Sequence, residues 1–244
     1  MSDYLARVYS RYSEVRPNAD APSSLAELLA GRETIYRKVF APWLPASKEA
    51  RILDLGCGYG EFLYFLQQKG YRQAEGIDLN PQQVEVAGRL GVRNIRWGDA
   101  QSALTESSQE FDCITALDVL EHIPKSQVLD VLDLIYRSLR PGGRFICQVP
   151  NLAAFYCPCF YMDFSHETPF TGSSLKQALE LANFTNIRVL PGGPVVFGVK
   201  SAVRWVLWRM ISSGLRFVQT VEGGPHQPIE SIFTTVIFAV ADKA

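Results

Sequence analysis

The sequence predicts a single α/β domain built on a doubly wound, mainly parallel sheet of seven strands. From Arg51 onward, short apolar stretches alternate with helix-patterned stretches, an alternation typical of consecutive βαβ units. A glycine-rich turn, DLGCGYG at residues 54–60, separates the first apolar stretch from the first helical pattern. The chain has 244 residues, of which 47% are hydrophobic, so it can bury one sizeable core.

The first fifty residues mix polar and apolar positions and are expected to form an N-terminal helical lid segment. A helical pattern runs from Ser24 to Phe40, and its apolar anchors include Leu25, Leu28 and Ile35. Such a leading helix either covers a ligand as a lid or packs on the sheet edge.

Residues 51–190 are expected to form the ligand-binding core. The expected strands cover 51–55, 73–78, 93–97, 111–117, 143–149 and 185–190. Pro141, Gly142 and Gly143 are expected to end a helix over Ser126–Leu139 and turn the chain into the fifth strand. Residues 191–230 are interpreted as a helical insertion, and a last strand, Ser231 to Val240, completes the sheet within residues 231–244.

The glycine-rich turn is the strongest indication of a ligand site. Glycines at 56, 58 and 60 allow a tight turn and a close approach of the backbone to a ligand. A dinucleotide fingerprint would place its third glycine where Glu61 stands. The carboxylate of Asp54 suits an amino acid ammonium group and would repel a pyrophosphate. These features predict a cofactor cradle that is not made for NAD.

The run ILDLGCGYGEF is followed by EGIDLN, FDCITALDVLEHI and LRPGGRFICQVPN. Together these motifs resemble the class I S-adenosylmethionine-dependent methyltransferases over Arg51 to Val189. The resemblance implies S-adenosylmethionine as the cofactor. The cofactor-binding residues expected on this basis are Asp54, Gly56, Cys57, Gly58, Gly60, Asp78, Leu79, Asp99, Ala100, Leu117 and Asp118.

Two acidic residues of this set have specific expected roles. Asp78 ends the second strand, where a carboxylate can accept hydrogen bonds from both ribose hydroxyls; the alternative is an N-cap for the helix opening at Pro81. Asp99, in WGDA, is where similar methyltransferases hold the adenine amino group; the alternative is a loop aspartate that caps a turn.

The acceptor side is expected near His122 and in FYMDFSHETPF, residues 160–170. That stretch looks like the region after the fifth strand in methyltransferases encoded with bacterial surface-polysaccharide genes. His166 is interpreted as a general base oriented by Asp163, and His122 is expected at the mouth where acceptors enter. One alternative is that His166 has a structural role and only fixes the loop, and another is that His122 only hydrogen-bonds to the following loop. A third is that Asp163, His166 and Glu167 bind a metal. We predict no metal site.

These features predict an O-methyltransferase acting on a sugar hydroxyl of a bacterial glycan or glycan precursor, such as an O-antigen unit. One alternative is methylation of a hydrophobic small molecule, a quinone or a lipid, because the DVLEH segment also resembles quinone methyltransferases. Another is a non-catalytic binding module with a methyltransferase fold.

Within the insertion, Lys200 to Val221 carries four cations, two tryptophans and no acids. Arginines and aromatic rings on one helix suit an anionic membrane surface. At about 100° per residue, however, Lys200 and Arg204 face nearly opposite to Arg209 and Arg216. The segment is therefore interpreted as a peripheral membrane contact, a partner or homodimer surface, or a plain packing helix.

Composition limits the remaining possibilities. The net charge of −1 provides no field to attract nucleic acid, so no nucleic-acid partner is expected. The start of the sequence lacks an apolar signal region, and we expect a cytoplasmic protein, at most at the inner face of the membrane. The five cysteines are expected to be reduced packing residues: Cys57, Cys113, Cys147, Cys157 and Cys159.

Overall fold

The computed structural model describes residues 21–106, 108–156 and 160–244. It contains the predicted seven-stranded sheet, in the order β3-β2-β1-β4-β5-β7-β6. The strands are β1 (Ile52–Leu55), β2 (Ala74–Asp78), β3 (Ile95–Trp97), β4 (Phe111–Leu117), β5 (Leu139–Pro150), β6 (Thr185–Pro191) and β7 (Val236–Asp242). The first five strands are parallel, whereas β7 runs antiparallel to both β5 and β6. The doubly wound, mainly parallel fold is therefore confirmed.

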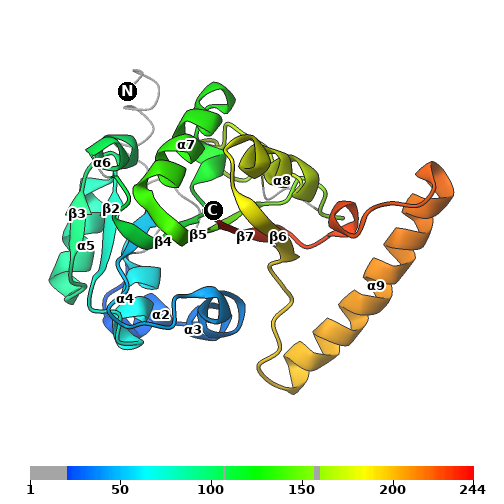
Figure 1. Cartoon of the computed structure of the whole chain (residues 1–244). Helices are drawn as coiled ribbons and strands as arrows, with labels where there is room; N and C mark the ends of the chain where they lie inside the picture. Colours follow the sequence, from blue (N-terminus) through cyan, green and yellow to red (C-terminus); the bar gives the residue numbers. More distant parts are fainter. Residues whose placement is uncertain (1–20, 107, 157–159) are drawn as a thin grey trace.

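Helices cover both faces of this sheet (Figure 1). They are α2 (Leu25–Leu29), α3 (Glu33–Ile35), α4 (Glu61–Gln68), α5 (Pro81–Leu90), α6 (Ala100–Glu106), α7 (Val128–Ser138), α8 (Gly172–Leu181) and α9 (Val199–Gly223). Side chains alternate between two buried clusters, because neighbouring residues of a strand point to opposite faces. In β1, Leu53 and Leu55 join one cluster and Ile52 the other.

The predicted helix from Ser24 to Phe40 is interrupted. Gly31 takes a left-handed φ of +73° between α2 and α3, and Tyr36–Phe40 is a π-helical turn. Glycine favours this break because it adopts positive φ without steric cost. The broken segment packs on the domain through Tyr36 and Phe40, whose rings lie 5.0 and 5.7 Å from that of Phe62.

The Pro-Gly-Gly turn also differs from its prediction. Helix α7 ends at Ser138 and β5 begins at Leu139, so Pro141 to Gly143 belong to the strand rather than to a connection. Gly142 N donates to Lys243 O at 3.1 Å, and Lys243 N donates to Gly143 O at 2.8 Å. The pairing with β4 shifts register across these residues, from Phe111 opposite Leu139 to Cys113 opposite Arg144. They therefore form a bulge in β5 that is bonded to the chain just beyond β7, about a hundred residues away in sequence.

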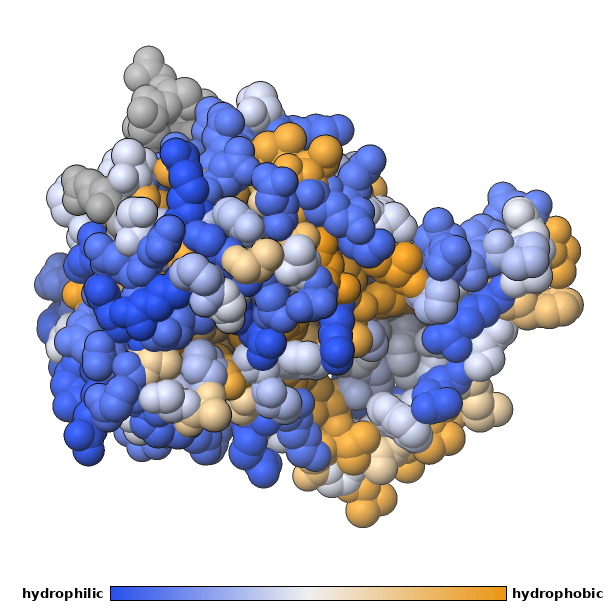
Figure 2. Space-filling view, viewed as in Figure 1, coloured by the Kyte–Doolittle hydropathy of each residue, from blue (hydrophilic) through white to orange (hydrophobic). Residues whose placement is uncertain are grey.

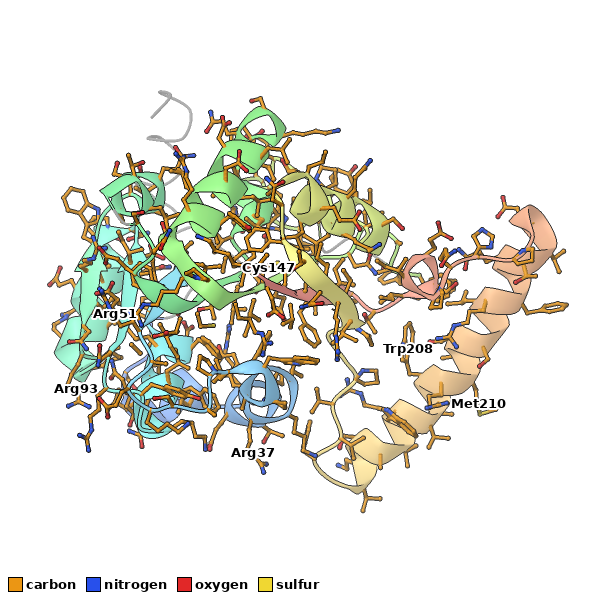
Figure 3. The ribbon with its side chains drawn as sticks, in the orientation of Figure 1. Arg37, Arg51, Arg93, Cys147, Trp208 and Met210 are labelled. Atoms are coloured by element: carbon orange, nitrogen blue, oxygen red, sulfur yellow. The ribbon has the colours of Figure 1, made fainter. Side chains whose placement is uncertain are left out.

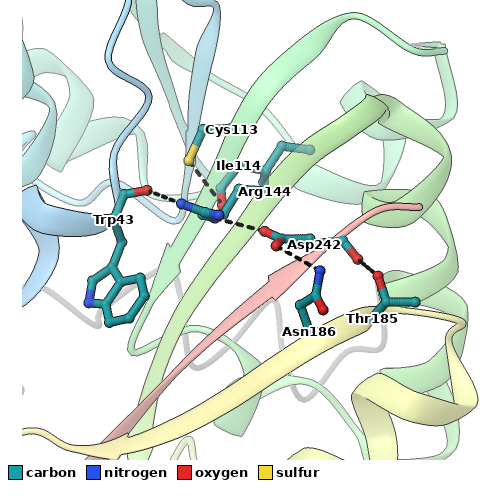
Figure 4. A network of polar contacts seen from close by, with 7 residues as sticks. All are labelled: Trp43, Cys113, Ile114, Arg144, Thr185, Asn186 and Asp242. Carbon is teal, nitrogen blue, oxygen red and sulfur yellow. Dashed lines mark hydrogen bonds and ion pairs between the residues drawn. The ribbon is translucent and has the colours of Figure 1, made fainter.

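The last strand begins later than predicted. Ser231 ends a 3-10 turn, Pro228–Ser231, and β7 extends to Asp242. Asp242 joins distant parts of the chain (Figure 4): Arg144 Nε donates to its Oδ1 at 2.7 Å, while Arg144 Nη1 donates to Trp43 O at 3.1 Å. The leading segment, β5 and β7 are therefore connected through one guanidinium group.

Helix α9 projects from the body of the domain (Figure 1) and confirms a helix within the predicted insertion. No helix in the described part of the chain has the length and apolar character needed to cross a membrane. Cys57, Cys113 and Cys147 are buried free thiols, as expected; Cys157, Cys159 and the first twenty residues of the predicted lid lie outside the described residues.

Candidate functional site

A cavity of about 1300 Å³ opens at the carboxyl ends of β1, β2 and β4. Strand order reverses between β1 and β4, and ligands of open α/β sheets bind at such a reversal. The predicted cofactor residues that line it are Asp54, Gly56, Cys57, Gly58, Asp78, Leu79, Asp99, Ala100, Leu117 and Asp118. Gly60 does not line the cavity; it precedes α4 with a φ of +79°.

The glycine turn has the close packing that its sequence predicts. Gly56 and Gly58 take φ values of +62° and +57°, which disfavour side chains. A Cβ atom on Gly56 would lie 2.5 Å from Val119 Cγ2, and one on Gly60 would lie 2.9 Å from Val92 Cγ1. Gly56 therefore fits against the segment after β4, whereas Gly60 is needed for packing at the start of α4.

Asp78 holds the glycine turn in place. Its Oδ2 accepts a hydrogen bond from Gly58 N at 2.7 Å, and its Oδ1 accepts one from Asn80 N at 2.8 Å. The alternative role as N-cap of the next helix is wrong, because Asn80 caps α5 by accepting from Gln82 N and Gln83 N. A carboxylate oxygen accepts more than one hydrogen bond, so Asp78 retains capacity for a ligand.

Asp54 lies at the end of β1 and is 2% exposed. Its Oδ1 accepts a hydrogen bond from Thr115 Oγ1 at 2.6 Å. Burial raises the pKa of Asp54 to about 7; the Thr115 bond opposes this shift, and the charges of Glu61 and Asp78 add to it. The carboxyl group therefore changes charge near neutral pH, within reach of a bound ligand.

Asp99 and Asp118 are each held by a neighbouring side chain. Asp99 Oδ2 accepts from Ser102 N at 3.0 Å and from Ser102 Oγ at 2.9 Å, so it caps the start of α6 while lining the cavity. Asp118 has a φ of +57°, and Gln148 Nε2 donates to both of its carboxylate oxygens, at 3.0 and 3.1 Å. Strained backbone of this kind is concentrated at functional sites.

The leading segment contributes part of the cavity wall, and the sequence did not identify which of its residues do so. Arg32, Ile35, Tyr36 and Phe40 line it, and burial raises the pKa of the Tyr36 hydroxyl. The segment therefore both lines the cavity and packs on the domain. The available sequence signal was the aromatic pair Tyr36 and Phe40, four residues apart and so on one helix face.

The two predicted acceptor-side histidines come together. The ring centroids of His122 and His166 lie 4.7 Å apart in an edge-to-face arrangement. The loop after β5 is fixed against the segment after β4, since Glu167 N and Thr168 N donate to Glu121 O at 2.7 and 3.0 Å. Of the two rings, His122 lines the cavity and His166 does not.

Hydrogen bonds define the tautomers of both rings. His166 Nδ1 lies 2.7 Å from Phe160 O, and a carbonyl oxygen only accepts. His122 Nδ1 lies 2.9 Å from Ser165 Oγ, which in turn donates to Asp163 Oδ1 at 2.6 Å. Nδ1 of both rings therefore acts as the donor in these contacts. The Asp163 carboxylate thus acts, through Ser165, on His122, whereas it was predicted to orient His166.

Glu121 was not predicted as part of this cluster. It is 1% exposed, and Glu121, His122 and His166 each place one ligand atom within 4.8 Å of the others. Neutral imidazoles whose Nδ1–H groups bond to oxygen are the form that binds divalent cations. The cluster can hold a metal ion or share a proton, and it differs from the alternative ligand set of Asp163, His166 and Glu167.

Comparison with known proteins identifies the domain. Residues 28–189 match the family model described as a methyltransferase domain. The ubiquinone biosynthesis O-methyltransferase of Xylella fastidiosa (strain 9a5c) is 34% identical over 113 residues, which are 43% of this chain and 45% of that protein. The match thus spans less than half the length of this curated relative.

Solved structures share the fold at low sequence identity. A SAM-dependent methyltransferase from Archaeoglobus fulgidus superposes with a TM-score of 0.64 at 20% identity, covering 99% of this chain and 100% of the other. Phosphoethanolamine N-methyltransferase 2 of Haemonchus contortus, in complex with S-adenosyl-L-methionine, superposes with a TM-score of 0.59 at 17% identity, over 90% and 57% of the two chains.

Proposed function

This chain belongs to the class I S-adenosylmethionine-dependent methyltransferases, and we propose that its acceptor is an aromatic hydroxyl group of a hydrophobic quinone precursor. The observation that carries this proposal is the apolar part of the cavity lining. Partly exposed apolar side chains there include Ile35, Leu134 and Val236. A polar sugar would leave these side chains facing hydroxyl groups, whereas an aromatic ring with an aliphatic chain would bury them.

The cavity fits the cofactor as well as an acceptor. Its volume of about 1300 Å³ exceeds the roughly 300–1,000 Å³ typical of a pocket for one small ligand. We propose that Gly56, Gly58, Asp78 and Asp99 hold the cofactor. When bound, S-adenosylmethionine supplies an electrophilic methyl group on a sulfonium, so the protein chiefly has to position the acceptor and remove its proton.

We assign proton removal to His122. It lines the cavity, and its Nδ1–H is directed to Ser165, so Nε2 of the neutral ring can accept the proton of an acceptor hydroxyl. Asp163 stabilises the resulting imidazolium through Ser165 Oγ. His166 packs against His122 at 4.7 Å and is a positioning residue.

The curated relative quoted above favours this acceptor over the predicted glycan. It is named for ubiquinone biosynthesis, which fits the alternative drawn from the DVLEH segment, residues 118–122. The sugar-hydroxyl and O-antigen prediction rested on residues 160–170, and His166, the general base that it named, does not line the cavity.

The test supplies the purified protein with methyl-labelled S-adenosylmethionine and one acceptor at a time. The acceptors are a catechol with a short prenyl chain, the same catechol without the chain, and a nucleotide-linked hexose. We expect label on the prenylated catechol, at a kcat/KM at least about tenfold above that for the bare ring, because the chain buries apolar surface. Label on the hexose alone would restore the glycan prediction. Cofactor binding without transfer to any acceptor would support the non-catalytic alternative.

The pKa of Asp54 leads to a prediction about cofactor affinity. Below about pH 7 the buried carboxyl binds a proton, and binding of the cofactor ammonium requires the ionised form. The dissociation constant for S-adenosylmethionine should therefore rise about 25-fold between pH 7.5 and pH 5.5. Isothermal titration at a series of pH values measures it, and Asp54→Asn should bind more weakly with a flat profile. An equally steep profile in Asp54→Asn would assign the titration to another group.

A further inference from the structure

Helix α9 presents most of its surface to solvent. It has 25 residues, of which Ser201 and Ser212 are buried, and it projects from the domain (Figure 1). Trp208 points back toward the domain, whereas Met210, 67% exposed, points away from it (Figure 3). One face is therefore directed inward and the opposite face outward.

The outward face is mainly apolar. At about 100° per residue, its apolar residues form a stripe roughly 140° wide in two stretches, 199–211 and 217–221, with Gly214 between them. Figure 2 shows hydrophobic residues along this outer edge. The stripe consists of Val199, Val203, Val206, Leu207, Met210, Ile211, Phe217, Val218 and Val221, each at least 48% exposed.

Cations flank this stripe on both sides. Arg204 lies on one flank, and Arg209 and Arg216 lie on the other. Lys200, in the first turn, lies within the angular range of the stripe near the N-terminal end of the helix. The cations do point in nearly opposite directions, as expected from the sequence, but the outward apolar stripe lies between them. From the positions of the cations alone, the sequence argued against an amphipathic helix. In the structure the helix is amphipathic, and its apolar side faces outward.

We propose that α9 lies flat on an anionic lipid surface, with its apolar stripe in the acyl boundary and its arginines at the phosphate groups. Long cationic side chains on both flanks reach headgroups while their stems contact apolar surface. Over its length of about 37 Å, the helix carries four cations and one acid, Glu222. A second copy docked on the stripe would bring these cations against one another, whereas anionic lipid neutralises them.

The connection between α9 and the cavity agrees with this placement. The chain leaves the cavity wall at Gly192, which packs against Val236, and reaches α9 seven residues later. Lys38 Nζ donates to Val196 O, so the connection is held to the leading segment that covers the cavity. A lipid surface under α9 would thus lie beside the segment that lines the acceptor site.

The test measures partition of the full chain into vesicles by flotation, with phosphatidylcholine alone and with phosphatidylcholine containing phosphatidylglycerol. We expect binding to the anionic vesicles that weakens as salt is raised. Met210→Glu/Phe217→Glu should reduce the partition coefficient at least about tenfold, while Leu181→Glu, an exposed apolar site on α8, should leave it unchanged. Arg204→Gln and Arg216→Gln should each reduce it about fivefold, and Arg93→Gln, elsewhere on the domain (Figure 3), should not.

Cofactor affinity of each variant checks that the fold is intact. No acceptor is present, so the result does not depend on the proposed acceptor. Absence of binding to anionic vesicles, or unchanged binding by Met210→Glu/Phe217→Glu, would overturn the proposal. A wild-type dimer in sedimentation equilibrium that this double variant dissociates would assign the stripe to a second copy instead.

Discussion

Asp78→Asn should raise the dissociation constant for S-adenosylmethionine about 100-fold. The carboxylate accepts from Gly58 N and Asn80 N and, in the proposed complex, from the two ribose hydroxyls. Charge-assisted hydrogen bonds contribute about 1.5–3 kcal/mol each, so loss of the charge and of one acceptor weakens both sets. Isothermal titration calorimetry measures the constant directly.

The matched control is Asp133→Asn, an exposed aspartate of α7 that does not line the cavity, and it should bind the cofactor normally. Thermal unfolding of both variants separates loss of a ligand contact from loss of the turn. Cofactor affinity within about threefold of the wild type in Asp78→Asn would contradict the proposed geometry.

His122→Gln should lower kcat by about 10²- to 10⁴-fold, the range expected for loss of a general base. Glutamine can still bond to Ser165 but cannot take up the acceptor proton. Affinity for S-adenosylmethionine should stay within about twofold of the wild type, because the cofactor residues lie elsewhere on the cavity wall. Single-turnover methyl transfer from labelled cofactor to the prenylated catechol measures the chemical step.

His226→Gln, a change at an exposed turn, is the control and should keep full activity. His166→Gln should cause a smaller loss and shift the pH profile of kcat, since it acts through His122. A chelator distinguishes the proton-acceptor role from a metal site. If a chelator abolishes wild-type activity and Zn²⁺ or Fe²⁺ restores it, the Glu121, His122 and His166 cluster serves as a metal site and the proton-acceptor role is wrong.

The order and type of the core elements could be predicted because each strand is a short apolar run bounded by turn residues. The cofactor residues followed from the same pattern, since parallel strands deliver their carboxyl ends to one edge. The predicted ends of helices and strands were wrong where contacts with distant parts of the chain determine where an element begins. Pro141 to Gly143 resemble a helix stop locally, but the chain beyond β7 keeps them in the sheet, and no local pattern contains that information.

On the acceptor side, the sequence identified the two histidines but did not reveal the role of each. His122 and His166 are 44 positions apart, and their contact depends on Thr168 Oγ1 donating to Ile123 O at 2.6 Å and on the Glu121 carbonyl. Side-chain spacing does not reveal such backbone anchoring. For the same reason Asp163 was paired with His166, three residues away, although its carboxylate accepts from Ser165 Oγ, which in turn contacts His122.

The position of β7 between β5 and β6 has a consequence for how the enzyme is made. Strand β6 pairs with β7, so it must wait for a strand that is synthesised about fifty residues later before it can join the sheet. Meanwhile β1 to β5 already pair with one another and can form as a nascent unit on the ribosome. Val236, at the start of β7, supplies part of the cavity wall. We therefore expect the nascent chain to assemble its nucleotide-binding half first and to become competent for the acceptor only when the final hairpin docks.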